Sequence, residues 1–308
     1  MAVTVASFAA CFGTYGVVSY MTPSSFALGD NSTQYAMTQP LVLLHYVGNF
    51  LLPLRLSADT DWHVLESVGD PRVAVGMAFL LARVAVVWHS WPTRERRAMA
   101  PVAFEVLWFL LALAPTSSLV PLSQVLNDHR TFFPYIGLAT AGAWALWLAM
   151  GWLRRRVPSL AGPVAVGTLA CLLIGSHAYG TFRRNQVWHD DASLWHDVTL
   201  KSPRNGRGLM NYGLSQMRRG EYDRALDYFT RALEVSPRYA YLHINLGVLK
   251  NAMGRLDESE DHFRQALEYR PGLATGYFYY GDVLRKRGSD ARGARPPGTC
   301  APAQPRDE

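Results

Sequence analysis

The segment NYGLSQMRRG at residues 211–220 returns 34 residues later as NLGVLKNAMG at 245–254, and again as YYGDVLRKRG at 279–288. Each copy has glycine at its third and its last position. Other residues also recur every 34 positions: Phe229 and Phe263, Ala232 and Ala266, and Pro203, Pro237 and Pro271. So many positions in register indicate one structural unit that is repeated along the chain.

A 34-residue period with these residue types resembles the tetratricopeptide repeat (TPR), whose unit is a pair of antiparallel helices, A and B. Small residues such as Gly213 and Ala225 let the two helices approach closely, and Phe229 fills the space between neighbours. Pro237 begins the next unit, where a helix interior could not continue. We therefore predict a TPR α-solenoid over residues 181–288, with a half-repeat helix around Ala192–Val198 ahead of the first full unit.

The composition differs sharply between the two parts of the chain. Residues 1–180 contain long apolar runs, 10 Arg, no Lys and 8 acidic residues, whereas the charged residues are crowded after Gly180. This contrast predicts a membrane domain at 1–180 followed by a water-exposed domain. The net charge of +6 is modest and spread over both parts, so it does not indicate nucleic-acid binding. Cys11, Cys171 and Cys300 have neither disulfide nor metal-site spacing.

Several apolar runs have the length of about 20 residues that a membrane-spanning helix needs. They lie at Pro71–Trp91, Pro101–Val120, Phe133–Leu153 and Leu160–Gly180. Met1–Tyr20 is a fifth candidate, with a cleaved signal peptide as the alternative, although no basic residue precedes Arg55. Residues 41–56 are shorter and contain Pro53, which favours an interfacial or re-entrant helix. The fold class is therefore all-α: about five spanning helices, then a TPR solenoid.

The arginines between these runs indicate how the chain crosses the membrane. Arg94, Arg96 and Arg97 follow the first of the four later runs, and Arg154, Arg155 and Arg156 follow the third. Both clusters are expected on the cytoplasmic side. The 121–131 loop and everything after Gly180 then lie outside the cytoplasm, although Arg183 and Arg184 oppose this weakly. We expect a multi-pass protein of the cell membrane with a periplasmic TPR domain.

Two charges lie inside the predicted spanning helices. Arg83 and Glu105 fall at similar depths in the cytoplasmic half of their helices, given about 1.5 Å per residue. A lone charge there is costly, so one hypothesis is an ion pair between the two helices. The alternative is that Arg83 extends toward the membrane surface while Glu105 lies near the headgroups.

A series of motifs in the membrane part resembles a known enzyme family. They are TQPLVLLHY (38–46), LLP (51–53), DTD (59–61), PTSSLVPL (115–122), NDHRTFFP (127–134), NQVWHDDASLW (185–195) and PRN (203–205). Their order is similar to that in the transmembrane and TPR-containing protein O-mannosyltransferases, especially the bacterial type. The resemblance implies a GT-C-like membrane domain that takes mannose from a polyprenyl-phosphate carrier. It also implies transfer to Ser or Thr of extracytoplasmic proteins, with the repeats receiving the acceptor.

The chain departs from this family at both ends. The family's acidic catalytic pair lies in a first extracytoplasmic loop that has no counterpart here, so the chain resembles the C-terminal part of the membrane domain. The third repeat has a helix A (Tyr277–Arg287), but residues 289–308 have the composition of a disordered tail instead of a helix B. We therefore expect an incomplete enzyme that is inactive alone. The alternative is a non-catalytic, membrane-anchored TPR scaffold.

Three neighbouring polar residues are the candidates for contact with the lipid phosphate of the sugar donor. A guanidinium gives two hydrogen bonds to phosphate oxygens, so Arg130 is the proposed ligand, with His129 as a second contact and Asp128 orienting either. The alternative is an interfacial cluster that caps a helix. Asp59 and Asp61 are weaker catalytic candidates, because paired carboxylates can act as a general base but more often start a turn. No metal site and no other cofactor motif is identifiable.

Asn211 and Asn245 occupy the same position of helix A in successive repeats, which faces the concave groove of a TPR stack. An Asn amide can donate to a peptide carbonyl and accept from a peptide N–H. A ladder of such amides would bind an extended acceptor peptide whatever its sequence. The third position is Tyr279, so the ladder has two rungs. The alternative is that both amides bridge neighbouring helices.

Overall fold

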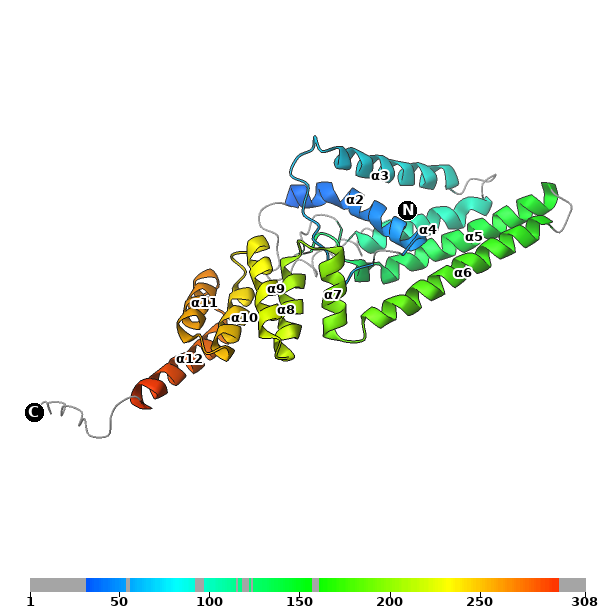
Figure 1. Cartoon of the computed structure of the whole chain (residues 1–308). Helices are drawn as coiled ribbons and strands as arrows, with labels where there is room; N and C mark the ends of the chain where they lie inside the picture. The colour runs from blue at the N-terminus through cyan, green and yellow to red at the C-terminus, as the bar shows by residue number, and fades with distance from the viewer. Residues whose placement is uncertain are drawn as a thin grey trace, which may run out of the picture. The chain divides into compact units, whose positions relative to one another are not determined.

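The computed structural model describes residues 32–53, 56–91, 97–114, 116–117, 122, 124–156 and 161–293. This described part consists of helices and the segments between them, without a strand, so the prediction of an all-α chain is confirmed. The chain divides into two compact units, Met1–Asp190 and Asp191–Glu308. In Figure 1 the first unit runs from blue to green and the second from yellow-green to red.

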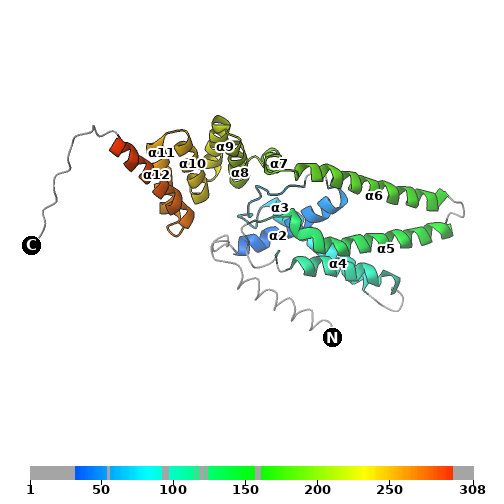
Figure 2. The same ribbon diagram turned by 90° about the horizontal axis from the view of Figure 1, so that it is seen from below.

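Within its described residues, the first unit contains five long helices and two short 3₁₀ turns. These are α2 (Ser32–Leu51), α3 (Pro71–Ser90), η2 (Arg97–Met99), α4 (Ala100–Leu113), η3 (Asp128–Thr131), α5 (Phe132–Arg156) and α6 (Ala161–Val187). Consecutive helices pack on one another from α2 to α6, and Figure 2 shows α4, α5 and α6 running alongside each other. Asp70 starts α3 by accepting a hydrogen bond from the Arg72 N–H, and Pro71 occupies the first helical position.

Three helical segments are long and apolar enough to cross a membrane: Pro71–Ser90, Asp128–Arg156 and Val164–Val187. They correspond to three of the predicted spans, although α6 continues past the predicted end at Gly180. Their surfaces fit a lipid environment, since large apolar side chains such as Leu172 (66 % exposed) and Ile174 (70 %) point outward. The candidate span at Met1–Tyr20 lies outside the described residues.

The span predicted at Pro101–Val120 is wrong in length. The helix found there, α4, has 14 residues and covers about 21 Å, which is less than the roughly 30 Å of a bilayer core. It ends because the chain turns after Leu113, whose carbonyl oxygen accepts hydrogen bonds from the N–H groups of both Thr116 and Ser117. The described residues therefore contain three apolar helices of spanning length, where about five were predicted for the whole chain.

The interfacial helix predicted at 41–56 also differs from the structure. Helix α2 begins at Ser32 and ends at Leu51, before Pro53. It is central to the first unit, because Val42 and Tyr46 are completely buried in a core that includes Phe109 of α4. The polar first half of α2 made a helix there hard to predict, and its Tyr35, Thr38 and Gln39 are buried too. The hydroxyl of Tyr35 donates to the Thr116 carbonyl at 2.7 Å.

The ion pair considered between Arg83 and Glu105 does not form among the described residues. The guanidinium carbon of Arg83 instead lies 4.8 Å from the centre of the Phe79 ring, one turn earlier on α3. Such a cation–π contact keeps the charge on its own helix. The Arg83 Nε atom is buried without a described hydrogen-bond partner.

Residues 191–293 of the second unit form a stack of six helices with the predicted repeat. They are α7 (Asp191–Lys201), α8 (Gly206–Arg218), α9 (Tyr222–Val235), α10 (Ala240–Ala252), α11 (Leu256–Tyr269) and α12 (Ala274–Gly293). Helices α8 and α9 pair as A and B of one repeat, and α10 and α11 pair as A and B of the next. The half-repeat expected at Ala192–Val198 is helix α7, which packs on α8.

The repeated glycines have the two roles that their spacing predicts. An added Cβ on Gly213 would lie 2.7 Å from the Phe229 ring, and one on Gly247 would lie 2.8 Å from the Phe263 ring. Only glycine lets helices A and B approach this closely. Gly220 and Gly254 follow their A helices with φ of +79° and +77°, a conformation that other residues rarely adopt.

The third repeat ends differently from the first two. Its glycine equivalent to Gly220 and Gly254 is Gly288, which lies inside α12, and the helix continues to Gly293. Helix A of this repeat was predicted at Tyr277–Arg287, with a disordered tail from residue 289. The start of that tail is therefore helical, and residues 294–308 lie outside the described part.

Candidate functional site

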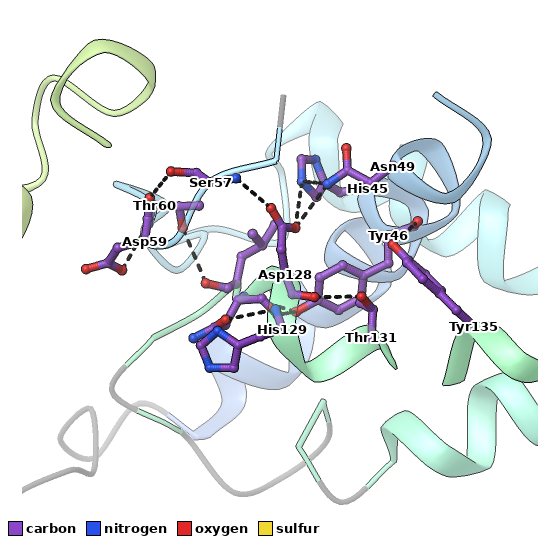
Figure 3. A network of polar contacts seen from close by, with 12 residues as sticks. His45, Tyr46, Asn49, Ser57, Asp59, Thr60, Asp128, His129, Thr131 and Tyr135 are labelled. Carbon is purple, nitrogen blue, oxygen red and sulfur yellow. Dashed lines mark hydrogen bonds and ion pairs between the residues drawn. The ribbon is translucent and has the colours of Figure 1, made fainter. Parts of the chain in front are cut away.

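The polar cluster around η3 contains most of the residues that the sequence suggested for the membrane unit (Figure 3). The Asp128 carboxylate accepts one hydrogen bond from the Asn49 amide and one from the Ser57 backbone N–H, both at 3.0 Å. His45 Nε2 lies 3.8 Å from the same carboxylate. Asp128 therefore joins helix α2 to the segment that follows it. The sequence led us to expect that Asp128 orients Arg130 or His129. Its described partners are instead Asn49, Ser57 and His45.

Tyr46 extends this network from the middle of α2. Its hydroxyl donates to the Asn127 carbonyl and accepts from the Asn127 N–H, both at 3.1 Å. The Tyr135 hydroxyl on α5 donates to the Tyr46 carbonyl at 2.8 Å. Burial raises the pKa of Tyr46 to about 12, so the phenol stays protonated and keeps its donor role over the physiological pH range.

The two aspartates considered as a catalytic pair lie in different surroundings. Asp59 is 4 % exposed, and its Oδ1 atom accepts hydrogen bonds from the Thr60 N–H and the Gln124 amide, both at 2.9 Å. Asp61 is only half-buried. A buried carboxylate that accepts from its own loop and from a distant amide fixes the loop in place, as the turn alternative predicted for Asp59.

His129 and Arg130 differ in exposure. His129 is exposed, and its backbone N–H donates to the Asn127 side chain at 3.2 Å, which caps η3. Arg130 is half-buried and its guanidinium lies beside the Tyr35 hydroxyl. Burial raises the pKa of that phenol, and the positive charge of Arg130 opposes the rise. The Arg130 Nη1 atom is buried and has no hydrogen-bond partner among the described residues.

Two further buried polar atoms lack a described partner near the same loop. They are the Oε1 atom of Gln39 and the Oγ atom of Ser117. Gln39 is anchored through its amide nitrogen, which donates to the Val125 carbonyl at 3.4 Å. Ser117 adjoins Thr116, the partner of Tyr35. Arg130 therefore faces a region with unused hydrogen-bonding capacity, whereas Asp128 is engaged near the other end of α2.

Sequence reasoning missed the residues of α2 that complete this network. His45 and Asn49 are four residues apart, so they lie on the same face of the helix, and the Asn49 amide is 2.9 Å from His45 Nε2. A usable signal existed, because His, Tyr and Asn at helical spacing interrupt an apolar run. Their partner, Asp128, is far away in sequence and carried no such signal.

In the second unit, the two asparagines are placed alike on successive A helices. Asn211 lies on α8 and Asn245 on α10, both half-buried. Neither side-chain amide has a hydrogen-bond partner within the described part of the chain. The third position holds Tyr279 on α12, whose ring is stacked on Phe263 with 6.4 Å between centroids and 12° between planes. The alternative role, bridging neighbouring helices, is filled instead by Asn251, which accepts from Lys286 at 3.3 Å.

A carboxylate that the sequence did not single out holds the end of the repeat stack. The Glu260 side chain on α11 is 7 % exposed and pairs with Arg264 of its own helix and with Arg287 of α12 at 2.6 Å. The Tyr280 hydroxyl donates to it at 3.1 Å. Burial alone would raise the pKa of Glu260, but these hydrogen bonds and charges hold it below its usual value.

One family model matches part of the second unit. Residues 206–272 match the family model described as tetratricopeptide repeat. Among solved structures, one described as the crystal structure of MamA is 14 % identical, with a TM-score of 0.26, and the match covers 52 % of this chain and 96 % of that one. No curated protein matches the sequence. Residues 206–272 are thus tetratricopeptide repeats, as their 34-residue period predicted.

Proposed function

We propose that this chain is a membrane-anchored protein whose repeats bind an extended segment of another protein. Tetratricopeptide repeats suggest protein–protein interaction, and three helices of the first unit have the length and composition of membrane spans. The observation that carries the proposal is the pair of Asn211 and Asn245 amides, equivalent in successive repeats and without intramolecular partners in the described structure.

The chemistry of these amides defines the class of partner. Each amide can donate one hydrogen bond to a peptide carbonyl and accept one from a peptide N–H, groups that every extended chain presents. Two amides one repeat apart would hold the backbone of such a chain irrespective of its side chains. Tyr279 would offer an aromatic surface next to them, since it is 37 % exposed. The expected partner is an unstructured protein segment.

Binding of a permanently unfolded protein tests this proposal. Reduced and carboxymethylated α-lactalbumin serves as the probe, and its affinity for the full chain in detergent is measured by biolayer interferometry. Replacing both Asn211 and Asn245 by Ala should weaken binding about thirtyfold or more, because four hydrogen bonds of at least about 0.5 kcal/mol each are lost. Gln265→Ala removes an exposed amide from helix α11 and is the matched control. Equal affinities for the wild type and the double variant would contradict the proposal.

A second candidate function is the one that the family resemblance implies. In it the first unit is part of an O-mannosyltransferase that takes its sugar from a polyprenyl-phosphate carrier, and the repeats receive the acceptor outside the cytoplasm. The unpartnered Nη1 atom of Arg130 favours this candidate, because guanidinium groups bind phosphate oxygens through paired hydrogen bonds. Asp61 is then the candidate general base, with Asp59 shaping its loop.

Lipid binding separates the two candidates. Native mass spectrometry of the purified chain with undecaprenyl phosphate should show a bound lipid whose occupancy falls in Arg130→Gln. Arg72→Gln is the matched control, since Arg72 is exposed and pairs with Asp70 at 2.7 Å. Identical occupancy in both variants would exclude Arg130 as the phosphate ligand and would leave the protein-binding function standing.

A further inference from the structure

The outer face of helix α12 is unusually apolar and exposed for a helix in a repeat stack. Tyr277 is 57 % exposed, Phe278 72 % and Leu284 45 %. Gly281 lies between them on the same face, one turn after Tyr277. An added Cβ on Gly281 would have no atom within 4 Å. The face is therefore an open apolar strip with an empty position at its centre.

The same positions are buried in the two preceding repeats. The residues 34 and 68 positions before Tyr277, Phe278 and Leu284 are their equivalents in the second and first repeats. Each is at most 6 % exposed: His243, Ile244 and Lys250 in the second repeat, and Leu209, Met210 and Gln216 in the first. Helix α12 thus has the surface of an ordinary A helix whose partner is missing within the described part.

The first two repeats show what covers this surface. In each, a B helix packs on the A helix and inserts one aromatic ring against its glycine, Phe229 on Gly213 and Phe263 on Gly247. Polar contacts from the same B helix support the packing in the second repeat. The Ser259 hydroxyl donates to the Gly247 carbonyl at 2.7 Å, and Glu258 pairs with Lys250 at 2.9 Å.

Residues 294–308 lack the sequence features of an equivalent B helix. Residues 294–308 contain prolines at 296, 297, 302 and 305 and no aromatic residue. Proline interrupts a helix interior, and the ring that would enter the Gly281 position is absent. Residues 294–308 therefore do not supply that ring.

We propose that the open face of α12 binds an amphipathic helix of another protein, which inserts an aromatic ring at Gly281. The chain's own B helices define the chemistry of that helix. One small residue lies four positions before the aromatic residue and another lies three positions after it, as Ala225 and Ala232 do relative to Phe229. This site is separate from the asparagine groove and takes a helix instead of an extended chain.

Charge complementarity sets the direction of the bound helix. Both B helices have acidic residues in their first turn, Asp223 in α9 and Asp257 with Glu258 in α11. In the C-terminal half of α12, Arg285 (side chain 79 % exposed) and Lys286 (50 %) share one carboxylate, Asp282, so this end keeps a net positive charge. An acidic first turn over this basic end gives the antiparallel arrangement that the first two repeats have.

A peptide taken from the chain itself is the probe for this site. A fluorescein-labelled peptide of residues 221–236 contains helix α9, and its anisotropy is followed on titration with the full chain in detergent. Saturable binding is expected. It should weaken about tenfold or more when the peptide carries Phe229→Ala, because the central aromatic residue of such an interface dominates its affinity.

Substitutions at Gly281 identify the binding site. Gly281→Leu fills the open position, where an added Cβ has no atom within 4 Å, so it should abolish peptide binding while hydrogen exchange of α12 stays unchanged. Gly272→Leu is the matched control, since an added Cβ there also has no atom within 4 Å. Should Gly281→Leu disturb α12, Phe278→Ser replaces it, because the Phe278 side chain is largely solvent-exposed. The Asn211→Ala and Asn245→Ala variant should bind the peptide normally.

Three results would overturn the proposal. They are no saturable binding, equal binding of the Phe229→Ala peptide, and equal weakening by Gly272→Leu and Gly281→Leu. Sedimentation velocity of the full chain gives a further check. Self-association that Gly281→Leu abolishes would assign the site to a second copy of this chain and would contradict a separate protein as its occupant.

Discussion

Each of the two units is stabilised internally by a different kind of contact. In the repeats, each A helix meets its B helix through a glycine and a phenylalanine that lie 16 residues apart in sequence, as Gly213 and Phe229 do. In the first unit, the central contacts join residues that are 71 to 81 positions apart, as Asp128 does with Asn49 and Ser57. Local contacts leave a period in the sequence, whereas long-range polar contacts leave none.

The largest expected effect comes from adding a side chain to a glycine that already packs against a phenylalanine ring. Gly213→Leu should destabilise the repeats by about 3 kcal/mol, because its Cβ would overlap the Phe229 ring. Gly281→Leu should leave stability nearly unchanged, since its position is open. Hydrogen exchange of α8 to α12 in the full chain measures both effects. Equal effects of the two substitutions would contradict the difference in packing between the Gly213 and Gly281 positions.

A smaller loss is expected when the polar network of the first unit loses its acceptor. Asp128→Ala leaves the Asn49 amide and the Ser57 N–H without their partner, at a cost of about 2 kcal/mol. Faster hydrogen exchange around Ser57, with unchanged exchange in α8 to α11, is the expected result. Glu66→Ala is the control, because it removes an exposed carboxylate from the same unit. Unchanged exchange around Ser57 would show that Asp128 does not hold this segment.

A loss of about 1 kcal/mol is expected at the end of the stack, where partly exposed arginines weaken each contact. Glu260→Gln should loosen α12, which exchanges faster while α8 is unaffected. The pKa of Glu260 is lowered in the folded chain, so its contribution is present above the ordinary glutamate pKa, near about 4.3. It is lost as the pH falls below that value. The variant should lack this pH dependence.

The smallest effect concerns the buried histidine pair of the second repeat. His243 Nδ1 lies 3.3 Å from His262 Nδ1, and His243 Nε2 lies 2.8 Å from the Pro237 carbonyl. Burial, and then the charges of His243 and Lys250, lower the pKa of His262. Its contribution to stability is therefore present above the ordinary histidine pKa, about 6.5, and lost as the pH falls below it.

Exchange of α10 and α11, corrected for the intrinsic rate, checks this expectation. It should quicken between about pH 6.5 and pH 5 in the wild type but not in His262→Phe. His196→Phe is the control, because His196 is exposed. The same pH dependence in all three proteins would assign it to other groups.

The sequence was sufficient for the repeats and insufficient for the first unit. The 34-residue period predicted the helix pairs, the glycine turns and the half-repeat α7. Each of these depends on residues within one repeat or in the adjacent helix. The period failed at Gly288, which lies inside α12 and not in a turn after it. In the first unit, hydropathy predicted α3, α5 and α6. It missed the start of α2 at Ser32, because residues such as Gln39 are buried through distant hydrogen bonds.

The candidate sites follow the same division. Asn211 and Asn245 could be placed from the period alone, since equivalent positions of a repeat face the same way. The partners of Asp128 could not, because nothing in the sequence relates Asp128 to Asn49. The sequence did place Arg130 next to a loop, but its contact with Tyr35 follows from the packing of α2.

The most direct test of the central claim is a hydrogen-exchange footprint of the full chain with and without reduced, carboxymethylated α-lactalbumin. The account predicts slower exchange in α8 and α10, the helices that carry Asn211 and Asn245, and little change in α9 and α11. Protection that is confined to α9 and α11, or no protection in the repeats, would contradict binding of an extended protein segment by the two asparagines.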